Sequence, residues 1–257
     1  MNRRIRKFIG LLWLLNIISP ILCASEMAES ASAVYTDPPS KEYMTKWMIA
    51  GPFPFESGAN APADWRIEPF GKAFGFDFLT QQGGESSIRP QEGMIQIWKE
   101  KEYPWKFYRS GDEDIDLVKV FGETENAVAY AYAEIKMTQP MKIYFAVGSD
   151  DAVKIWLNGV VIHENLTNRP LTLDEDLVSA EWKEGNNYLL LKIVNGIREW
   201  GFSCRPFVEE DIPLERLISR DLSRNPRLFS GLMALGAIVI GLIVFALVIF
   251  RIERRYD

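Results

Sequence analysis

Two adjacent carboxylates are the residues of this sequence best suited to bind a ligand. Asp150 and Asp151 follow Gly148 and Ser149 in a short polar corner between two apolar runs. Neighbouring carboxylates in a wet setting repel each other by roughly 1 kcal/mol, and a hard cation such as Ca²⁺, which prefers oxygen ligands, would turn that repulsion into attraction. The alternative is structural: Asp150 caps the turn by accepting backbone N–H bonds while Asp151 points to water. Both interpretations stay open.

Aromatic and amide side chains extend the candidate ligand site beyond the two carboxylates. Asp150, Asp151 and Asn165 could orient the hydroxyl groups of a ligand. Flat apolar platforms on which sugar rings stack could come from four tryptophans, Trp65, Trp98, Trp105 and Trp156. The sequence therefore predicts a site for carbohydrate or another small polar ligand.

Catalytic chemistry finds little support in the residue types. His163 is the only histidine, so a Ser-His-Asp arrangement would depend on it, and it ends a predicted strand beside Glu164, where a solvent-facing position is the simpler explanation. One histidine and two cysteines do not suffice for a zinc site. Paired acids are uninformative in a chain with 35 Asp and Glu residues. We therefore expect a non-enzymatic protein, with calcium at Asp150 and Asp151 as the one cofactor considered.

The Asp-Asp corner belongs to a predicted β-hairpin region. Residues 143–147 are β-branched and aromatic, and residues 153–157 alternate apolar with other side chains before Asn158-Gly159 and the apolar run 160–162. Asn-Gly supplies the two positive-φ positions of a type I′ turn, so 153–157 and 160–163 should pair antiparallel. The register of the hairpin follows from that turn.

Further short strands are predicted on both sides of the hairpin. Residues 127–137 alternate small and large side chains, and the alternating phenylalanines Phe74, Phe76 and Phe78 predict a strand within 71–79. Other candidates are 47–53, 95–98, 105–108, 178–182, 188–194 and 200–207. Because no convincing amphipathic helix separates these strands, we expect an all-β fold, an antiparallel sandwich spanning 41–208.

A family resemblance rests on the segments around this corner. They are Gly148-Ser-Asp-Asp-Ala-Val-Lys-Ile-Trp-Leu-Asn-Gly159, His163-Glu-Asn165, Asn168-Arg-Pro-Leu171, Asp174-Glu-Asp176 and Leu189-Leu-Leu-Lys192. They resemble the jelly-roll modules of bacterial secreted and surface proteins, of the galactose-binding-like, carbohydrate-binding-module type, over about 41–207. A weaker similarity is to PA14-type β-domains. In those relatives an Asp-Asp pair helps to hold calcium for sugar binding, a role that the resemblance implies here for Asp150 and Asp151 alone.

Composition narrows the classes of partner. The net charge of −6 and pI of about 5.1 give no basic footprint for nucleic acid.

Cys204 is alone in the predicted ectodomain, so that domain has no internal disulfide and its stability must come from core burial. We expect Cys204 to be a small buried residue rather than a nucleophile.

Both ends of the chain carry membrane-targeting patterns. Basic residues followed by the apolar run 8–23 predict a signal peptide over 1–25, and the composition of 26–40 predicts a flexible lead-in. After a juxtamembrane linker at 209–227, residues 228–250 form an uncharged run of about 23 residues, enough for one transmembrane helix. The arginines of the tail, 251–257, should stay in the cytoplasm. The sandwich would then lie on the extracytoplasmic side of a single-pass membrane protein.

Two classes of function are consistent with these patterns. The first is a membrane-anchored binding or sensing module for carbohydrate or another small polar ligand, and the order of leader, sandwich, linker and span resembles the front end of bacterial membrane receptors. The second is a structural or assembly protein of the cell envelope, which docks on a protein partner and binds no small ligand. Saccharide dependence distinguishes the two classes.

Overall fold

The computed structural model describes residues 32–56 and 70–216. The chain divides into two compact units, 1–209 and 210–257, and the strands that the structure describes belong to the first unit. The predicted leader, 1–25, and the predicted span, 228–250, lie outside the described residues. Within the described residues no helix has the length and apolar character needed to cross a bilayer.

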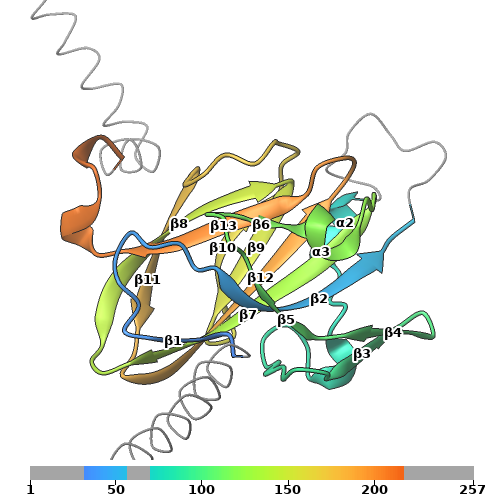
Figure 1. The fold of residues 1–257 in the computed structure, drawn as a ribbon, viewed down its shortest axis with the longest axis horizontal. Helices are drawn as coiled ribbons and strands as arrows, with labels where there is room; N and C mark the ends of the chain where they lie inside the picture. Colours follow the sequence, from blue (N-terminus) through green and yellow to red (C-terminus); the bar gives the residue numbers. More distant parts are fainter. Residues whose placement is uncertain (1–31, 57–69, 217–257) are drawn as a thin grey trace, which may run out of the picture. The chain divides into compact units, whose positions relative to one another are not determined.

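Two sheets form the body of the domain (Figure 1). The larger sheet has the order β10 (Val160–Asn165), β9 (Ala152–Leu157), β12 (Gly185–Asn195), β7 (Ala127–Met137), β2 (Lys46–Pro54) and β5 (Lys106–Arg109). The smaller sheet has the order β11 (Asp176–Trp182), β8 (Met141–Asp150), β13 (Gly201–Phe207) and β6 (Ile115–Asp116). All pairings along both orders are antiparallel. The all-β prediction is confirmed.

Short elements complete the domain. A separate hairpin joins β3 (Ile95–Trp98) to β4 (Lys101–Pro104), and β1 (Val34–Thr36) pairs in parallel with β7. Part of the segment predicted as a flexible lead-in is therefore a strand. The helices are α2 (Phe70–Gly75), α3 (Leu117–Phe121) and the 3₁₀ turns η1 (Thr80–Gln82) and η2 (Glu209–Asp211).

Strand β7 is central because both of its faces are buried. Its alanines at 127, 129, 131 and 133 face the smaller sheet, while Val128, Tyr130 and Tyr132 belong to a second apolar cluster on the opposite face. Small side chains on one face let the two sheets approach, and large ones on the other fill the space beneath the covering segment 70–105. The larger sheet thus lies between the smaller sheet and this cover.

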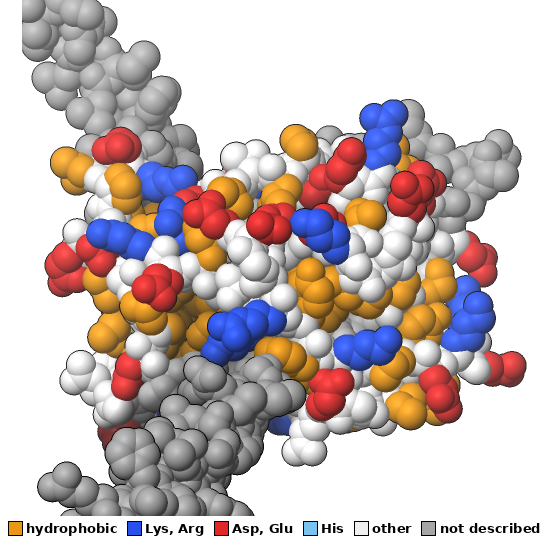
Figure 2. Space-filling view, in the orientation of Figure 1, with side chains coloured by type: hydrophobic (Ala, Val, Ile, Leu, Met, Phe, Trp, Pro, Cys, Tyr) orange, Lys and Arg blue, Asp and Glu red, His pale blue; other side chains and the backbone are white. Residues whose placement is uncertain are grey.

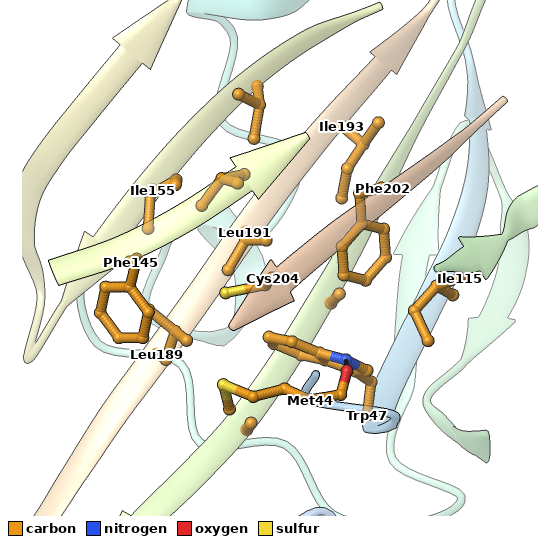
Figure 3. Close-up of a cluster of buried hydrophobic side chains, with 14 of the residues drawn as sticks. Met44, Trp47, Ile115, Phe145, Ile155, Leu189, Leu191, Ile193, Phe202 and Cys204 are labelled. Atoms are coloured by element: carbon orange, nitrogen blue, oxygen red, sulfur yellow. Dashed lines mark hydrogen bonds between the residues drawn. The ribbon is translucent and has the colours of Figure 1, made fainter. Parts of the chain in front are cut away.

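The core between the sheets is aromatic and sulfur-containing. Figure 3 shows Phe202 and Cys204 of β13 among side chains of the larger sheet, Trp47 and Leu191 included. The rings of Trp47 and Phe202 meet edge to face with their centroids 5.3 Å apart. Cys204 is 1% exposed and unbonded to another cysteine, and burial raises the pKa of its thiol. The prediction of a buried, structural cysteine is confirmed.

The predicted hairpin forms with the expected turn. Leu157 pairs with Val160, and both Asn158 and Gly159 have positive φ, 54° and 82°. The Asn158 side chain accepts a hydrogen bond from the Tyr188 N–H at 3.0 Å and so attaches the turn to β12. A Cβ atom at Gly159 would lie 2.2 Å from the carbonyl oxygen of Ser86, so glycine is required for contact as well as for φ.

The strand predicted within 71–79 is wrong. Residues 70–75 form α2, with Phe70, Ala73 and Phe74 buried at a helical spacing of three and four. The helix ends at Gly75, so Phe76 and Phe78 lie beyond it, and they are 44% and 3% exposed. Three alternating phenylalanines matched a strand only because the helix is too short for its own period to appear.

The outer surface carries charges of both signs. Figure 2 shows acidic and basic side chains interspersed with apolar ones on one face of the domain. The largest exposed apolar side chains of the two-sheet body include Val160, at 66% exposure, on the edge strand β10.

Candidate functional site

The Asp150-Asp151 corner joins β8 to β9, and its two carboxylates play different parts. Asp151 is 4% exposed; its Oδ1 accepts the Arg169 N–H at 3.0 Å and its Oδ2 accepts the Gly196 N–H at 2.8 Å. One carboxylate thus fastens two loops that are far apart in sequence. The expectation that Asp151 would face water is therefore wrong, whereas Asp150 does accept one backbone N–H bond, from Leu171.

Asp150 instead lines a cavity of about 480 Å³. The cavity walls come from the β6–α3 segment, the loop after Arg169 and the start of β13: Asp114, Asp116, Val118, Asp150, Pro170, Leu171, Glu199, Trp200 and Gly201. Its size lies within the range of about 300–1,000 Å³ that is typical of small-molecule sites. Four carboxylates share this space with apolar surface.

The electrostatics of the corner follow from burial and like charge. Burial raises the pKa of Asp150 to about 7, with the neighbouring charges of Asp151 and Glu199 acting in the same direction and the Leu171 N–H opposing them. Burial also raises the pKa of Asp151, against the two backbone N–H bonds that favour its ionised form. Perturbed carboxyl groups in a cavity are typical of functional sites.

Helix α3 and the loop before β13 fix the wall around Trp200. Asp116 caps α3 by accepting the Lys119 N–H at 3.0 Å, and the Leu117 N–H donates to the Trp200 carbonyl at 2.9 Å. The Trp200 ring packs on Phe121 with centroids 5.7 Å apart. Trp200 is 2% exposed, and its Nε1 donates no hydrogen bond to any described residue. The wall is therefore preformed.

A second, more open cavity of about 790 Å³ adjoins the first through Asp114, which lines both. Arg205 forms part of its wall and is held by Asp174, whose Oδ1 accepts Arg205 Nε–H at 2.9 Å and the Tyr43 hydroxyl at 3.2 Å. The guanidinium of Arg205 also lies 4.5 Å from the Tyr43 ring centroid. Its positive charge is thus already paired within the protein.

A hydrogen-bond network around Asp176 includes Asn165, a predicted ligand contact, and places His163 beside the same carboxylate. Arg169 donates to both oxygens of Asp176, at 3.2 Å from Nη1 and 2.6 Å from Nη2. Asn165 Nδ2 donates to Oδ1 at 3.1 Å, and His163 Nε2 lies 3.1 Å from Oδ2. Despite burial, the partners His163 and Arg169 hold the pKa of Asp176 well below its usual range. Asn165, a predicted ligand contact, is thus engaged inside the domain.

The predicted tryptophans do not gather at the corner. Trp105 and Trp156 are 0% and 4% exposed and pack in the cluster beneath the covering segment, so their rings offer no open face. Trp98 is partly exposed on β3, with its centroid 5.0 Å from Phe76, and does not line the Asp150 cavity. Trp65 lies outside the described residues.

The cavity uses residues that the sequence did not single out for binding. Asp114, Asp116 and Glu199 were not among the predicted ligand residues. The sequence signal that existed was the density of acids over residues 112–116, together with Trp200 at the edge of the resembling segment. As for metals, no group of three or more His, Cys, Asp or Glu side chains in 32–56 and 70–216 is arranged to hold an ion.

Comparisons with known proteins add little to this geometry. No protein-family model and no curated protein matches the chain. Solved structures with partial similarity include an anti-sigma factor domain-containing protein, with 12% identity over 41% of this chain and 38% of that chain and a TM-score of 0.33. The chain thus spans less than half of that protein. It also spans 15% of a β-glucosidase from Kluyveromyces marxianus in complex with glucose, with 13% identity over 48% of this chain and a TM-score of 0.34.

A third similarity is to a family 35 carbohydrate-binding module from Clostridium thermocellum. It has 11% identity over 38% of this chain and 89% of that chain, with a TM-score of 0.26. A PA14 domain of the antifreeze protein MpAFP shows 13% identity over 35% of this chain and 50% of that chain, with a TM-score of 0.27. At such scores no argument about this chain rests on these structures, and the case for function comes from the site.

Proposed function

We propose that the described domain is a binding module that takes a small polar ligand, carbohydrate being the expected class, into the cavity beside Asp150. One observation carries the proposal: a carboxylate that is 9% exposed lines a cavity of about 480 Å³ and receives no side-chain hydrogen bond from a described residue. Buried charges are usually paired, so an unpaired one facing a cavity fits a group reserved for a ligand.

The walls suit a polyhydroxylated molecule. Carboxylates accept hydrogen bonds from hydroxyl groups, and Pro170 and Leu171 supply apolar surface for the C–H face of a ring. The cavity is held by backbone bonds to Asp151 and by the cap of α3, so a ligand would meet a preorganised site. We propose binding without catalysis at this site.

The cellular setting of the proposal rests on the two ends of the chain. The basic and apolar leader and the uncharged run 228–250 support export of the domain and anchoring by a single membrane helix, with residues 251–257 in the cytoplasm. In that arrangement the domain would serve as the sensing part of an envelope or signalling assembly. A calcium ion at Asp150 and Asp151 would bind only weakly, because both Asp151 oxygens already accept backbone N–H bonds.

Calorimetry on the full chain in detergent tests the binding proposal. A panel of neutral, amino and acidic oligosaccharides, each with and without Ca²⁺, should contain at least one saccharide whose binding is lost in Asp150→Asn. The matched control is Glu184→Gln, which changes an exposed carboxylate in the β11–β12 turn. Binding that survives Asp150→Asn would place the ligand elsewhere, and absence of any saccharide binding would contradict the proposal.

A docking role is the second candidate, and one observation favours it. The edge strand β10 presents Val160 and Val161, 66% and 42% exposed, beside unpaired backbone groups that could accept another strand. A protein that serves only in docking would bind no saccharide in the calorimetric panel, and Val160→Lys should weaken its assembly without affecting the Asp150 cavity.

A further inference from the structure

The charge of the Asp150 cavity is one-sided. Asp114, Asp116, Asp150 and Glu199 line it, and no Lys, Arg or His is among the described residues of its wall. Asp116 is partly neutralised, since Lys119 Nζ lies 3.5 Å from its Oδ2. Asp114, Asp150 and Glu199 have no ion-pair partner among the described residues.

Three other carboxylates that are buried or largely buried each have a cation as partner. Asp174 is paired with Arg205, Asp176 with Arg169, and Glu85 with Lys192, whose Nζ lies 3.0 Å from Oε1. Asp150 is the buried carboxylate that combines open cavity space with no such partner among the described residues. A ligand with a positive charge could therefore supply the cation that Asp150 lacks.

Three kinds of ligand group can satisfy carboxylates, and the geometry separates them. A neutral hydroxyl donates a hydrogen bond but leaves the repulsion between carboxylates in place. A calcium ion needs six to eight oxygens at about 2.3–2.6 Å, and no group of three or more acidic, His or Cys side chains converges in this way among the described residues. An ammonium group has three donors that can reach separate carboxylates at ordinary hydrogen-bond distances and brings a positive charge.

We infer that the ligand of the Asp150 cavity carries a protonated primary amine on a hydroxylated ring, as an amino sugar does. This inference rests on the function proposed above and names the ligand class. Asp150 and Glu199 would face the ammonium group, while Pro170 and Leu171 would contact the ring. Charge-assisted hydrogen bonds are about twice as strong as neutral ones. The cavity should therefore bind a sugar with a protonated amine more tightly than an otherwise similar sugar without one.

The test compares two trisaccharides that differ only in their amines: tri-glucosamine and its fully N-acetylated counterpart. Calorimetry is performed on the full chain in detergent at pH 7.0, where part of both the amines and the Asp150 carboxyl group is charged, at low and at high salt. We expect tri-glucosamine to bind at least about tenfold more tightly, and added salt to reduce this difference. Asp150→Asn and Glu199→Gln should each reduce it as well, and Glu184→Gln should leave it unchanged.

The outcomes separate this inference from the proposal on which it rests. Equal binding of the two trisaccharides, lost in Asp150→Asn, would overturn the amine and leave the binding module intact. Binding of neither, together with no response to any other saccharide, would overturn both. Tri-glucosamine binding that is unaffected by both Asp150→Asn and Glu199→Gln would show attraction to the acidic surface and would also overturn the inference. Thermal melts of each variant establish that it is folded.

Discussion

Two buried charges lie in different parts of this domain and are treated in opposite ways. On the covered face of the larger sheet, Lys192 is 0% exposed, and its Nζ donates to the Phe74 carbonyl at 2.9 Å and to Glu85 Oε1 at 3.0 Å. At the end of β8, Asp150 is 9% exposed and has neither a cation nor a side-chain donor among the described residues.

The difference between the two regions indicates what each is for. Burial lowers the pKa of Lys192 and raises that of Glu85, and in each case the charge of the partner opposes the shift. The Tyr130 hydroxyl adds a bond of 2.6 Å to Glu85, so this network is closed and leaves no free group for a ligand. The Asp150 corner, in contrast, is open to a cavity, and its carboxyl pKa is near neutrality. Both properties are typical of a group that binds a ligand.

The largest expected effect comes from breaking the closed network. Lys192→Met would leave Glu85 buried without its cation and should lower the free energy of unfolding by about 3–5 kcal/mol, measured by urea denaturation. The double variant Lys192→Met/Glu85→Gln should recover a substantial part of that loss, since no uncompensated charge remains. A single variant as stable as the parent chain would contradict the account of the network.

The next effect concerns the paired half of the corner. Asp151→Ala removes the acceptor of the Arg169 and Gly196 N–H groups and should destabilise the domain by roughly 2–4 kcal/mol in the same denaturation experiment. The milder Asp151→Asn keeps one carbonyl acceptor and should cost less. If Asp151→Ala were the less damaging of the two, the fastening role of this carboxylate would be disproved.

A smaller effect, of opposite sign, is expected at Asp150. Its pKa is higher in the folded than in the unfolded chain, so protonation favours folding, and this stabilisation is lost as pH rises from about 4 through about 7. The shift corresponds to about 4 kcal/mol, which screening by water in the cavity should reduce to roughly 2 kcal/mol. Asp150→Asn should therefore be more stable than the parent chain by roughly 2 kcal/mol at pH 8 and nearly equal to it at pH 4. Unfolding curves across this range check the sign. A parent chain that gains stability over the Asn variant as pH rises would refute the assignment.

Calcium should give the smallest effect. With only Asp150 and Asp151 as proposed protein ligands, millimolar Ca²⁺ should raise stability by less than about 1 kcal/mol, through simple mass action. The increment, followed as the thermal midpoint, should disappear in Asp150→Asn and be absent with Mg²⁺. A large, saturable increment would instead indicate a metal centre and would place Asp150 among the paired charges of the domain.

The sequence predicted the hairpin well because the information is local. Asn158 and Gly159 specify their own backbone angles and fix the pairing of Leu157 with Val160, while further along the register shifts between Val161 and His163. The covering layer was harder, because α2 is six residues long and its phenylalanines also fit a strand. A short apolar pattern cannot define its period without knowledge of what packs on it.

The candidate site was predicted only at its corner. The buried position of Asp151 depends on hydrogen bonds from the Arg169 and Gly196 backbones, which lie 18 and 45 residues from Asp151 in sequence. Glu199 and Asp116 reach the cavity through strand pairing of β13 with β6, also a non-local contact. Trp156 appeared to be a platform because strand alternation alone does not reveal that the larger sheet is covered on both faces.

The Asp151 carboxylate has a consequence for how specificity could diversify. It accepts hydrogen bonds from the backbone N–H groups of Arg169 and Gly196. Pro170, Leu171 and Glu199, which lie one to three positions after these residues, line the cavity. The loops are thus attached to Asp151 through their backbones, whereas side chains would contact the ligand. Backbone N–H groups are common to every residue except proline, so changing the side chains need not remove the attachment. Libraries varied at 170, 171 and 199 should retain the loop framework, so this corner offers a starting point for selecting new binding preferences without redesigning the scaffold.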